Sequence, residues 1–163
     1  MTTAANADLF SNLRPGQELG CSAWVAVNQG MIDRFAEATL DLDPMHVDSE
    51  WARNKGPFGH TIAFGFLTTS LLTHLLHLAM HTDHAREPAV EGYFMNYGFD
   101  RMRLSAPVPV DSRIRGRFHV LESRRDSKDR IVVKFGSTVE IEGSEKPALV
   151  AEWLAIWVPP ESR

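Results

Sequence analysis

Hydrophobic residues follow two different spacings along the chain, and these divide it into a helical first half and a β-rich second half. From residue 29 to 39, apolar residues recur at helical spacing after Asn28, a favourable N-cap residue. From residue 65 to 80, apolar residues cover most of a helix circumference, which predicts a long helix buried on nearly all sides. A sheet wrapped around this helix is an economical way to bury it.

The second half of the chain contains the segments expected to form that sheet. Four strands are predicted, over residues 94–104, 112–123, 130–142 and 149–158. The last of these is apolar on both faces, so it is expected to be covered on both sides. Charged or glycine- and proline-containing turns separate the strands, and shorter elements are predicted at 20–27 (strand) and 49–54 (helix). The expected architecture is α+β, with one domain over residues 15–160 after a flexible arm over residues 1–14.

Composition disfavours several classes of function. The net charge is −4, with 17 basic and 21 acidic residues, so a nucleic-acid partner is not expected. No segment reaches the roughly 18 uncharged apolar residues of a membrane-spanning helix, so no membrane partner is expected. Cys21 is the only cysteine, which excludes an internal disulfide, and the first residues lack the features of a secretory signal. We therefore expect a cytoplasmic protein.

The densest group of ionisable residues lies between Asp41 and Asp48, in a loop that Pro44 shapes. One interpretation is a turn followed by an N-cap, because Asp and Pro are common turn residues. The other is paired acid–base chemistry, for which a carboxylate and an imidazole are suited. Hydration of a double bond conjugated to a thioester needs a base for water and a proton for Cα. Asp41 and His46 are the residues that can supply them.

The same reaction needs a group that stabilises negative charge on the thioester oxygen. Gly65 opens the predicted long helix, and a glycine allows a ligand to approach the backbone closely. Backbone N–H groups at a buried helix N-terminus can stabilise such an oxyanion. The alternative interpretation is an ordinary helix entry.

Histidines recur at His74, His77, His81 and His84, with a spacing that places them on one face of a continuing helix. Imidazole is a common zinc ligand, so a metal stripe is one interpretation. Histidines also suit a helix C-terminus, where their charge complements the helix dipole. We favour this second interpretation and expect no metal.

Taken together, three motifs resemble the hydratase motif of MaoC-like hotdog proteins, in particular their NodN-like branch. The motifs are Asp41-x-x-Pro44-x-His46-x-Asp48, Gly56-Pro57-Phe58-Gly59 and Ile62-Ala63-x-Gly65-Phe66-Leu67. The resemblance continues through residues 96–101 and 106–110 and covers residues 15–158. It implies a hotdog fold, in which an antiparallel sheet wraps around a long central helix, and a homodimer.

The resemblance also implies roles for individual residues. Asp41 and His46 match the catalytic pair that holds and activates water, and Gly65 matches the glycine whose N–H polarises the thioester carbonyl. Ser70 falls where related hydratases place a pocket serine. The other residues expected at the substrate pocket are Asp43, Phe64 and Asn96.

This chain departs from the family pattern at three positions. Leu40 stands where the family has glycine, Asp43 where it has asparagine, and Phe64 where it has a histidine, for which His60 is a possible partial substitute.

The function that the resemblance implies is that of an (R)-specific enoyl-CoA hydratase, a hydro-lyase without a metal or redox cofactor. Its substrate would be an acyl-CoA or acyl-carrier-protein thioester. Two alternatives stay open: a hotdog thioesterase, and a non-catalytic acyl-thioester-binding subunit of a heteromeric dehydratase.

Overall fold

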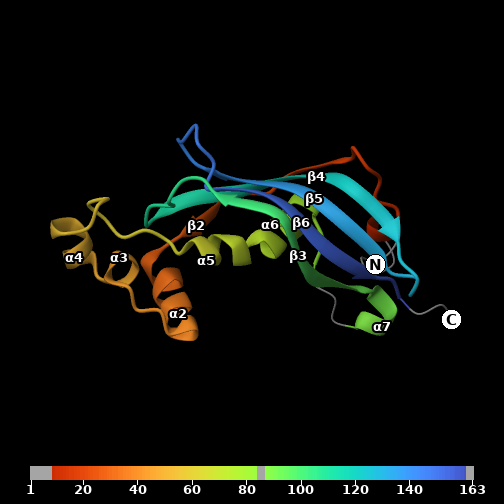
Figure 1. Cartoon of the computed structure of the whole chain (residues 1–163), viewed down its shortest axis with the longest axis horizontal. Helices are drawn as coiled ribbons and strands as arrows, with labels where there is room; N and C mark the ends of the chain where they lie inside the picture. Colours follow the sequence, from red (N-terminus) through yellow and green to blue (C-terminus); the bar gives the residue numbers. More distant parts are fainter. Residues whose placement is uncertain (1–8, 84–86, 161–163) are drawn as a thin grey trace.

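A computed structural model describes residues 9–83 and 87–160 and contains one sheet with helices against it (Figure 1). The helices are α2 (Gln29–Thr39), α3 (Pro44–Val47), α4 (Ser49–Asn54), α5 (Gly65–Ser70), α6 (Leu72–Met80) and α7 (Pro88–Glu91). The strands are β1 (Glu18–Cys21), β2 (Val25–Val27), β3 (Tyr93–Leu104), β4 (Ser112–Arg125), β5 (Ile131–Ile141) and β6 (Leu149–Val158). None of the helices within these ranges combines the length and apolarity needed to cross a membrane.

The sheet is antiparallel, with the strand order β1-β4-β5-β6-β3, and β2 also pairs with β4. Its register places Phe118 opposite Ser137 and Phe135 opposite Trp153, so large side chains on neighbouring strands share the inner face. Helices α5 and α6 lie against that face, while α2, α3 and α4 form a group at one end (Figure 1).

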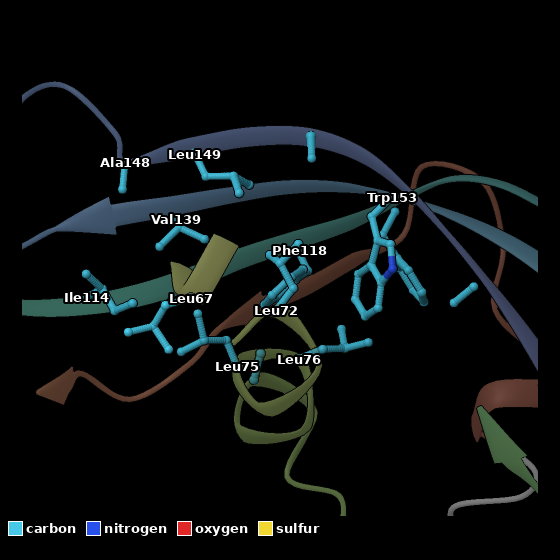
Figure 2. Close-up of a cluster of buried hydrophobic side chains, with 14 of the residues drawn as sticks. Leu67, Leu72, Leu75, Leu76, Ile114, Phe118, Val139, Ala148, Leu149 and Trp153 are labelled. Carbon is cyan, nitrogen blue, oxygen red and sulfur yellow. The ribbon is translucent and has the colours of Figure 1, made fainter. Parts of the chain in front are cut away.

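The core lies between α6 and the inner face of the sheet. Leu72, Leu75 and Leu76 are almost completely buried and lie next to Phe118 and Trp153 (Figure 2). Each leucine buried in this way contributes roughly 1.5–3 kcal/mol relative to an exposed one. The predicted α+β hotdog arrangement, with an antiparallel sheet curved around a central helix, is confirmed.

The predicted continuous helix from 65 to 80 is divided into α5 and α6 at Leu71, which keeps right-handed helical angles (φ −75°, ψ −11°). Three successive hydroxyl side chains precede the division. Thr68, Thr69 and Ser70 each donate to the carbonyl oxygen four residues earlier, at 3.4, 2.9 and 2.7 Å. Such bonds compete with the backbone for helix carbonyls and bend helices, which accounts for the interruption at this point.

The predicted strand over residues 20–27 is two strands, β1 and β2, separated by residues 22–24. The Ser22 N–H donates to the Gly116 carbonyl oxygen at 2.8 Å, and the Ser22 Oγ accepts from the Gly116 N–H at 2.9 Å. A side-chain oxygen therefore takes the place of a backbone carbonyl in the ladder, and regular pairing stops there. The one-turn helix α7 was not predicted; Pro88 occupies its first turn, where proline is tolerated.

The outer face of the sheet is more polar than the pattern of residues 149–158 predicted. Ile156 is buried on that face, but Val150 is 44% exposed. Arg115 pairs with Glu140 at 2.6 Å, and Lys134 lies between Asp100 and Glu122 at 2.8 and 2.5 Å. Hydrogen bonds to these two carboxylates raise the pKa of Lys134.

The prediction of a flexible arm does not hold for residues 9–14, while residues 1–8 lie outside the described ranges. Residues 9–11 are helical, and Phe10 and Leu13 are buried in the core. The Phe10 ring lies 4.5 Å from that of Phe94 and 4.9 Å from that of Trp157, between centroids. The composition of this segment did not indicate that Phe10 and Leu13 are core residues.

We therefore expect Phe10→Ala to lower the free energy of unfolding by about 3 kcal/mol, because it removes a fully packed aromatic side chain. Leu9→Ala is the matched control, since Leu9 is the next residue and is 36% exposed. Urea unfolding of both variants measures the difference. Equal, small effects of the two substitutions would show that the segment is not part of the core.

Candidate functional site

The loop predicted to carry the chemistry contains a short helix, α3, which positions His46. The Asp43 side chain accepts from the Met45 N–H at 2.8 Å, and Pro44 occupies the first turn. An aspartate N-cap followed by proline is a favourable helix start. Asp43 is thus used as a cap, and it lines neither of the two cavities described below.

The His46 imidazole is held by one hydrogen bond and one ring contact. Its Nδ1 lies 2.7 Å from the Ile62 carbonyl oxygen. Because a carbonyl oxygen can only accept, Nδ1 carries the hydrogen, and in the neutral ring Nε2 keeps a lone pair. His46 is therefore in the tautomer that can accept a proton through Nε2.

Phe64 lies directly against the His46 ring. The two ring centroids are 3.8 Å apart with an interplanar angle of 30°, and Phe64 also contacts Phe35 at 5.3 Å. The side chain is 5% exposed and lines neither cavity. Phe64, expected at the substrate pocket, is therefore placed outside both cavities and packs against the imidazole.

His46 and Gly65 line the same cavity, of about 230 Å³, at the start of α5. The other walls come from the 104–108 segment, from Thr68 and from Ala148. Within the described residues, the Gly65 N–H has no hydrogen-bond partner. One cavity is therefore lined both by the residue with the acceptor nitrogen and by the residue with the unpartnered backbone donor.

The absence of a side chain at Gly65 leaves room for the Leu104 side chain, at the end of β3. A Cβ built on Gly65 would lie 2.3 Å from a methyl carbon of Leu104, far inside normal contact. Leu104 is 47% exposed and lines the same cavity. A larger residue at 65 would therefore displace the end of the Leu104 side chain.

Asp41 lies on the loop before α3 and is exposed. Its Oδ1 accepts from the Asp43 N–H at 3.3 Å, and it does not line the cavity. No hydrogen bond joins Asp41 to His46 among the residues that the structure describes. The two members of the expected pair are thus close in sequence, but only His46 reaches the cavity.

Ser70 and Asn96 line a second cavity, of about 370 Å³, between α5 and β3. The Ser70 Oγ donates to the Phe66 carbonyl oxygen at 2.7 Å. The aromatic residues Phe66, Tyr97 and Phe99 form part of its walls. The two cavities share no lining residue, so the expected site residues are divided between them.

Gln29 is a contact of His46 that the sequence did not indicate. Its Nε2 donates to the His46 carbonyl oxygen at 2.8 Å, across a separation of 17 residues. No local spacing connects the two positions, and only the packing of α2 against α3 brings them together.

Two of the other histidines, His60 and His77, have hydrogen-bond partners within the chain. His60 is exposed, and its Nδ1 lies 3.0 Å from the Thr61 carbonyl oxygen. His77 is buried, with Nδ1 2.8 Å from Thr82 Oγ1. His84 lies outside the described residues. In the parts of the chain that are described, no three His, Cys, Asp or Glu side chains are grouped to hold a metal.

Comparison with known proteins gives consistent matches over most of the chain. Residues 10–142 match the model of the MaoC like domain. The chain is 44% identical to Nodulation protein N of Rhizobium leguminosarum bv. viciae over 143 residues, which cover 88% of this chain and 86% of that protein.

Two further similarities extend this match. The chain is 41% identical to 3-hydroxyacyl-thioester dehydratase Z of Mycobacterium tuberculosis (strain ATCC 25618 / H37Rv), over 88% of this chain and 90% of that protein. The solved structure of R-Hydratase PhaJ1 from Pseudomonas aeruginosa superposes with a TM-score of 0.69 at 20% identity. That superposition covers 93% of this chain and 86% of the other, and shows a shared fold.

The departure at Leu40 has a direct consequence for stability. Leu40 has left-handed backbone angles (φ 59°, ψ 22°) and is 87% exposed. A left-handed conformation costs an L-residue roughly 1–2 kcal/mol, and glycine escapes it at a smaller entropic cost. We expect Leu40→Gly to raise the free energy of unfolding by about 0.5–1 kcal/mol.

Leu42→Gly is the control for this measurement, since Leu42 is also exposed, at 66%, but has no positive φ. It is expected to lower stability, because glycine adds freedom to the unfolded chain. Urea unfolding compares the two variants. A loss of stability in both would contradict the strain assigned to Leu40.

Proposed function

This chain belongs to the MaoC-like domain family, and from that premise we propose that it is a hydro-lyase that adds water to trans-2-enoyl thioesters to form (R)-3-hydroxyacyl thioesters. One observation supports this most strongly: His46, whose Nε2 can accept a proton, and Gly65, whose backbone N–H is unpartnered among the described residues, line the same cavity. The name of the similar 3-hydroxyacyl-thioester dehydratase describes the reverse reaction on such a thioester. The (R) configuration follows from the family resemblance.

In the proposed reaction, His46 Nε2 takes a proton from water while the water oxygen bonds to Cβ. The electron pair of the double bond moves toward the carbonyl, and negative charge develops on the thioester oxygen. The Gly65 N–H stabilises that oxygen, because a fixed donor in a partly enclosed site costs little reorganisation. A proton then returns to Cα, and the net change is the addition of one water. The steps balance without a metal or redox cofactor.

Asp41 has a supporting part in this proposal. It is the exposed carboxylate on the loop that leads directly into the His46 helix, and its own Oδ1 accepts only a 3.3 Å hydrogen bond from Asp43. A weakly engaged carboxylate there can turn to hold the attacking water or to supply the proton for Cα. The thioester can be carried by CoA or by an acyl-carrier protein, because the reacting atoms are the same.

We expect Asp41→Asn and His46→Gln each to lower kcat by about 10²-fold or more, as for the loss of an acid–base group. His60→Gln is the matched control, because His60 is exposed and does not line the His46 cavity. Circular dichroism confirms that each variant is folded. The assay follows enoyl absorbance and free thiol separately, with crotonyl-CoA and longer enoyl-CoAs.

The same assay separates the alternatives. Thiol release from saturated acyl-CoA, with enoyl compounds unhydrated, would identify a thioesterase. Binding of both without turnover would identify a non-catalytic subunit, in agreement with the position of Asp41 outside the cavity. Near wild-type turnover of either variant would remove that residue from the mechanism.

We also propose that two copies of the chain associate through the α5–β3 side. Strand β3 pairs only with β6 among the described strands, so its other edge is open. Phe66, Tyr97 and Phe99 are 68, 64 and 38% exposed along this side, around the second cavity. Exposed aromatic patches beside an open strand edge are typical of interfaces.

Light scattering is expected to give about twice the monomer mass of 18.3 kDa at micromolar concentration. Phe66→Glu is expected to shift the protein toward the monomer. Val150→Glu tests the outer face of the sheet in the same way, because Val150 is 44% exposed there. A wild-type monomer, or dissociation by Val150→Glu alone, would contradict the proposed interface.

A further inference from the structure

Gln29, the first residue of α2, is hydrogen-bonded to α3, to the 61–64 segment and to Asp33 on its own helix. Its Nε2 donates to the His46 carbonyl oxygen at 2.8 Å and to Asp33 Oδ1 at 2.7 Å. Its Oε1 accepts from Thr61 Oγ1 at 2.6 Å. Both amide hydrogens and the amide oxygen are therefore engaged, and the side chain is partly buried.

We propose that Gln29 is a positioning residue that sets the orientation of the His46 imidazole. This inference rests on the proposed function, because its effect on activity is exerted through His46. Gln29 does not line the His46 cavity, so it acts without touching the substrate.

Gln29 is bonded close to both partners of the hydrogen bond that determines the His46 tautomer. One partner is His46, whose backbone carbonyl oxygen accepts a hydrogen bond from Gln29 Nε2. The other partner is the Ile62 carbonyl oxygen, which accepts from His46 Nδ1. The residue before it, Thr61, donates through its side chain to Gln29 Oε1. A single side chain therefore fixes α3 and the 61–64 segment relative to each other, and with them the two partners of the 2.7 Å bond.

The chemistry of the partners determines which way the amide faces. Nε2 faces a carboxylate and a carbonyl, which can only accept, while Oε1 faces a hydroxyl. A flipped amide would place its oxygen against two acceptors. Asp33, one turn further along α2, thus keeps the amide in the orientation that serves His46.

The fold does not depend on Gln29 alone. The Ile62 N–H donates to the Met45 carbonyl oxygen at 3.3 Å, so α3 and the 61–64 segment keep a backbone contact without Gln29. Removing the side chain is therefore expected to loosen the His46 geometry while the chain stays folded. This separates a positioning role from a purely structural one.

The test uses Gln29→Ala, which removes all three bonds, and Gln29→Glu, which keeps the acceptor for Thr61 but loses the donors to His46 and Asp33 at neutral pH. Glu37→Ala is the control, an exposed position on the same helix. Long-range ¹⁵N–¹H NMR of the histidine rings reports the His46 tautomer directly. Steady-state kinetics with crotonyl-CoA provide the second readout.

We expect the wild-type ring to carry its hydrogen on Nδ1, and both Gln29 variants to lose that preference. Their kcat is expected to fall about tenfold, within the range for a misplaced catalytic group, with KM changed less than about twofold. Glu37→Ala should leave both readouts unchanged. If Gln29→Ala does not fold, Gln29→Glu decides the outcome.

Failure of this inference is distinguishable from failure of the proposed function. A protein that does not hydrate enoyl thioesters still reports the tautomer by NMR, and loss of the Nδ1–H preference in the variants would support the positioning role. A folded Gln29 variant that keeps the wild-type tautomer would overturn it. If the wild-type protein is active, a folded Gln29 variant with an unchanged kcat would overturn it as well.

Discussion

The hydrogen bond between His46 Nδ1 and the Ile62 carbonyl oxygen, 2.7 Å long, is the contact on which the site depends. It joins the short helix α3 to the segment that leads into α5, and it leaves Nε2 as the acceptor of the neutral ring. Phe64 supports the ring from one side, and Gln29 holds the backbone near both partners. Without this bond the imidazole would have two exchangeable tautomers and no fixed direction.

The hotdog core gives this contact its rigidity. The leucines of α6 are packed against the sheet, and only Leu71 separates α6 from α5. The beginning of α5 is therefore held in place relative to β3. Leu104 at the end of β3 then lies so close to Gly65 that a side chain at 65 would have to displace the end of the leucine. The same packing that stabilises the domain therefore keeps a backbone donor available beside His46.

Much of the fold could be predicted from the sequence because it follows local rules. Asn28 capped α2 as expected, with its side chain accepting from the Met31 N–H, and α2 has the predicted bounds. Alternating apolar residues predicted the four long strands to within a few residues. The division at Leu71 was missed because hydroxyl bonds to helix carbonyls leave the apolar pattern unchanged. Phe10 was missed because a single aromatic in a polar segment has no periodicity.

The site was less predictable, because its contacts join residues distant in the chain. His46 and Gly65 were predicted and share a cavity, whereas Ser70 and Asn96 line a different one. Phe64 was expected at the substrate and instead supports His46, because the direction of a side chain at a helix N-cap is set by packing. Gln29 lies 17 residues from His46, and no motif or spacing in the sequence connected it with the site.

Binding of the thioester beside His46 and Gly65 can be measured by NMR titration of the His46→Gln variant with crotonyl-CoA. The slow variant allows the complex to persist during the measurement. The Gly65 amide proton is predicted to shift downfield to saturation with crotonyl-CoA and to remain unchanged with free CoA, because the carbonyl oxygen accepts from it. An unchanged Gly65 amide, with saturable shifts at Ser70 and Asn96, would place the thioester in the other cavity and contradict the account.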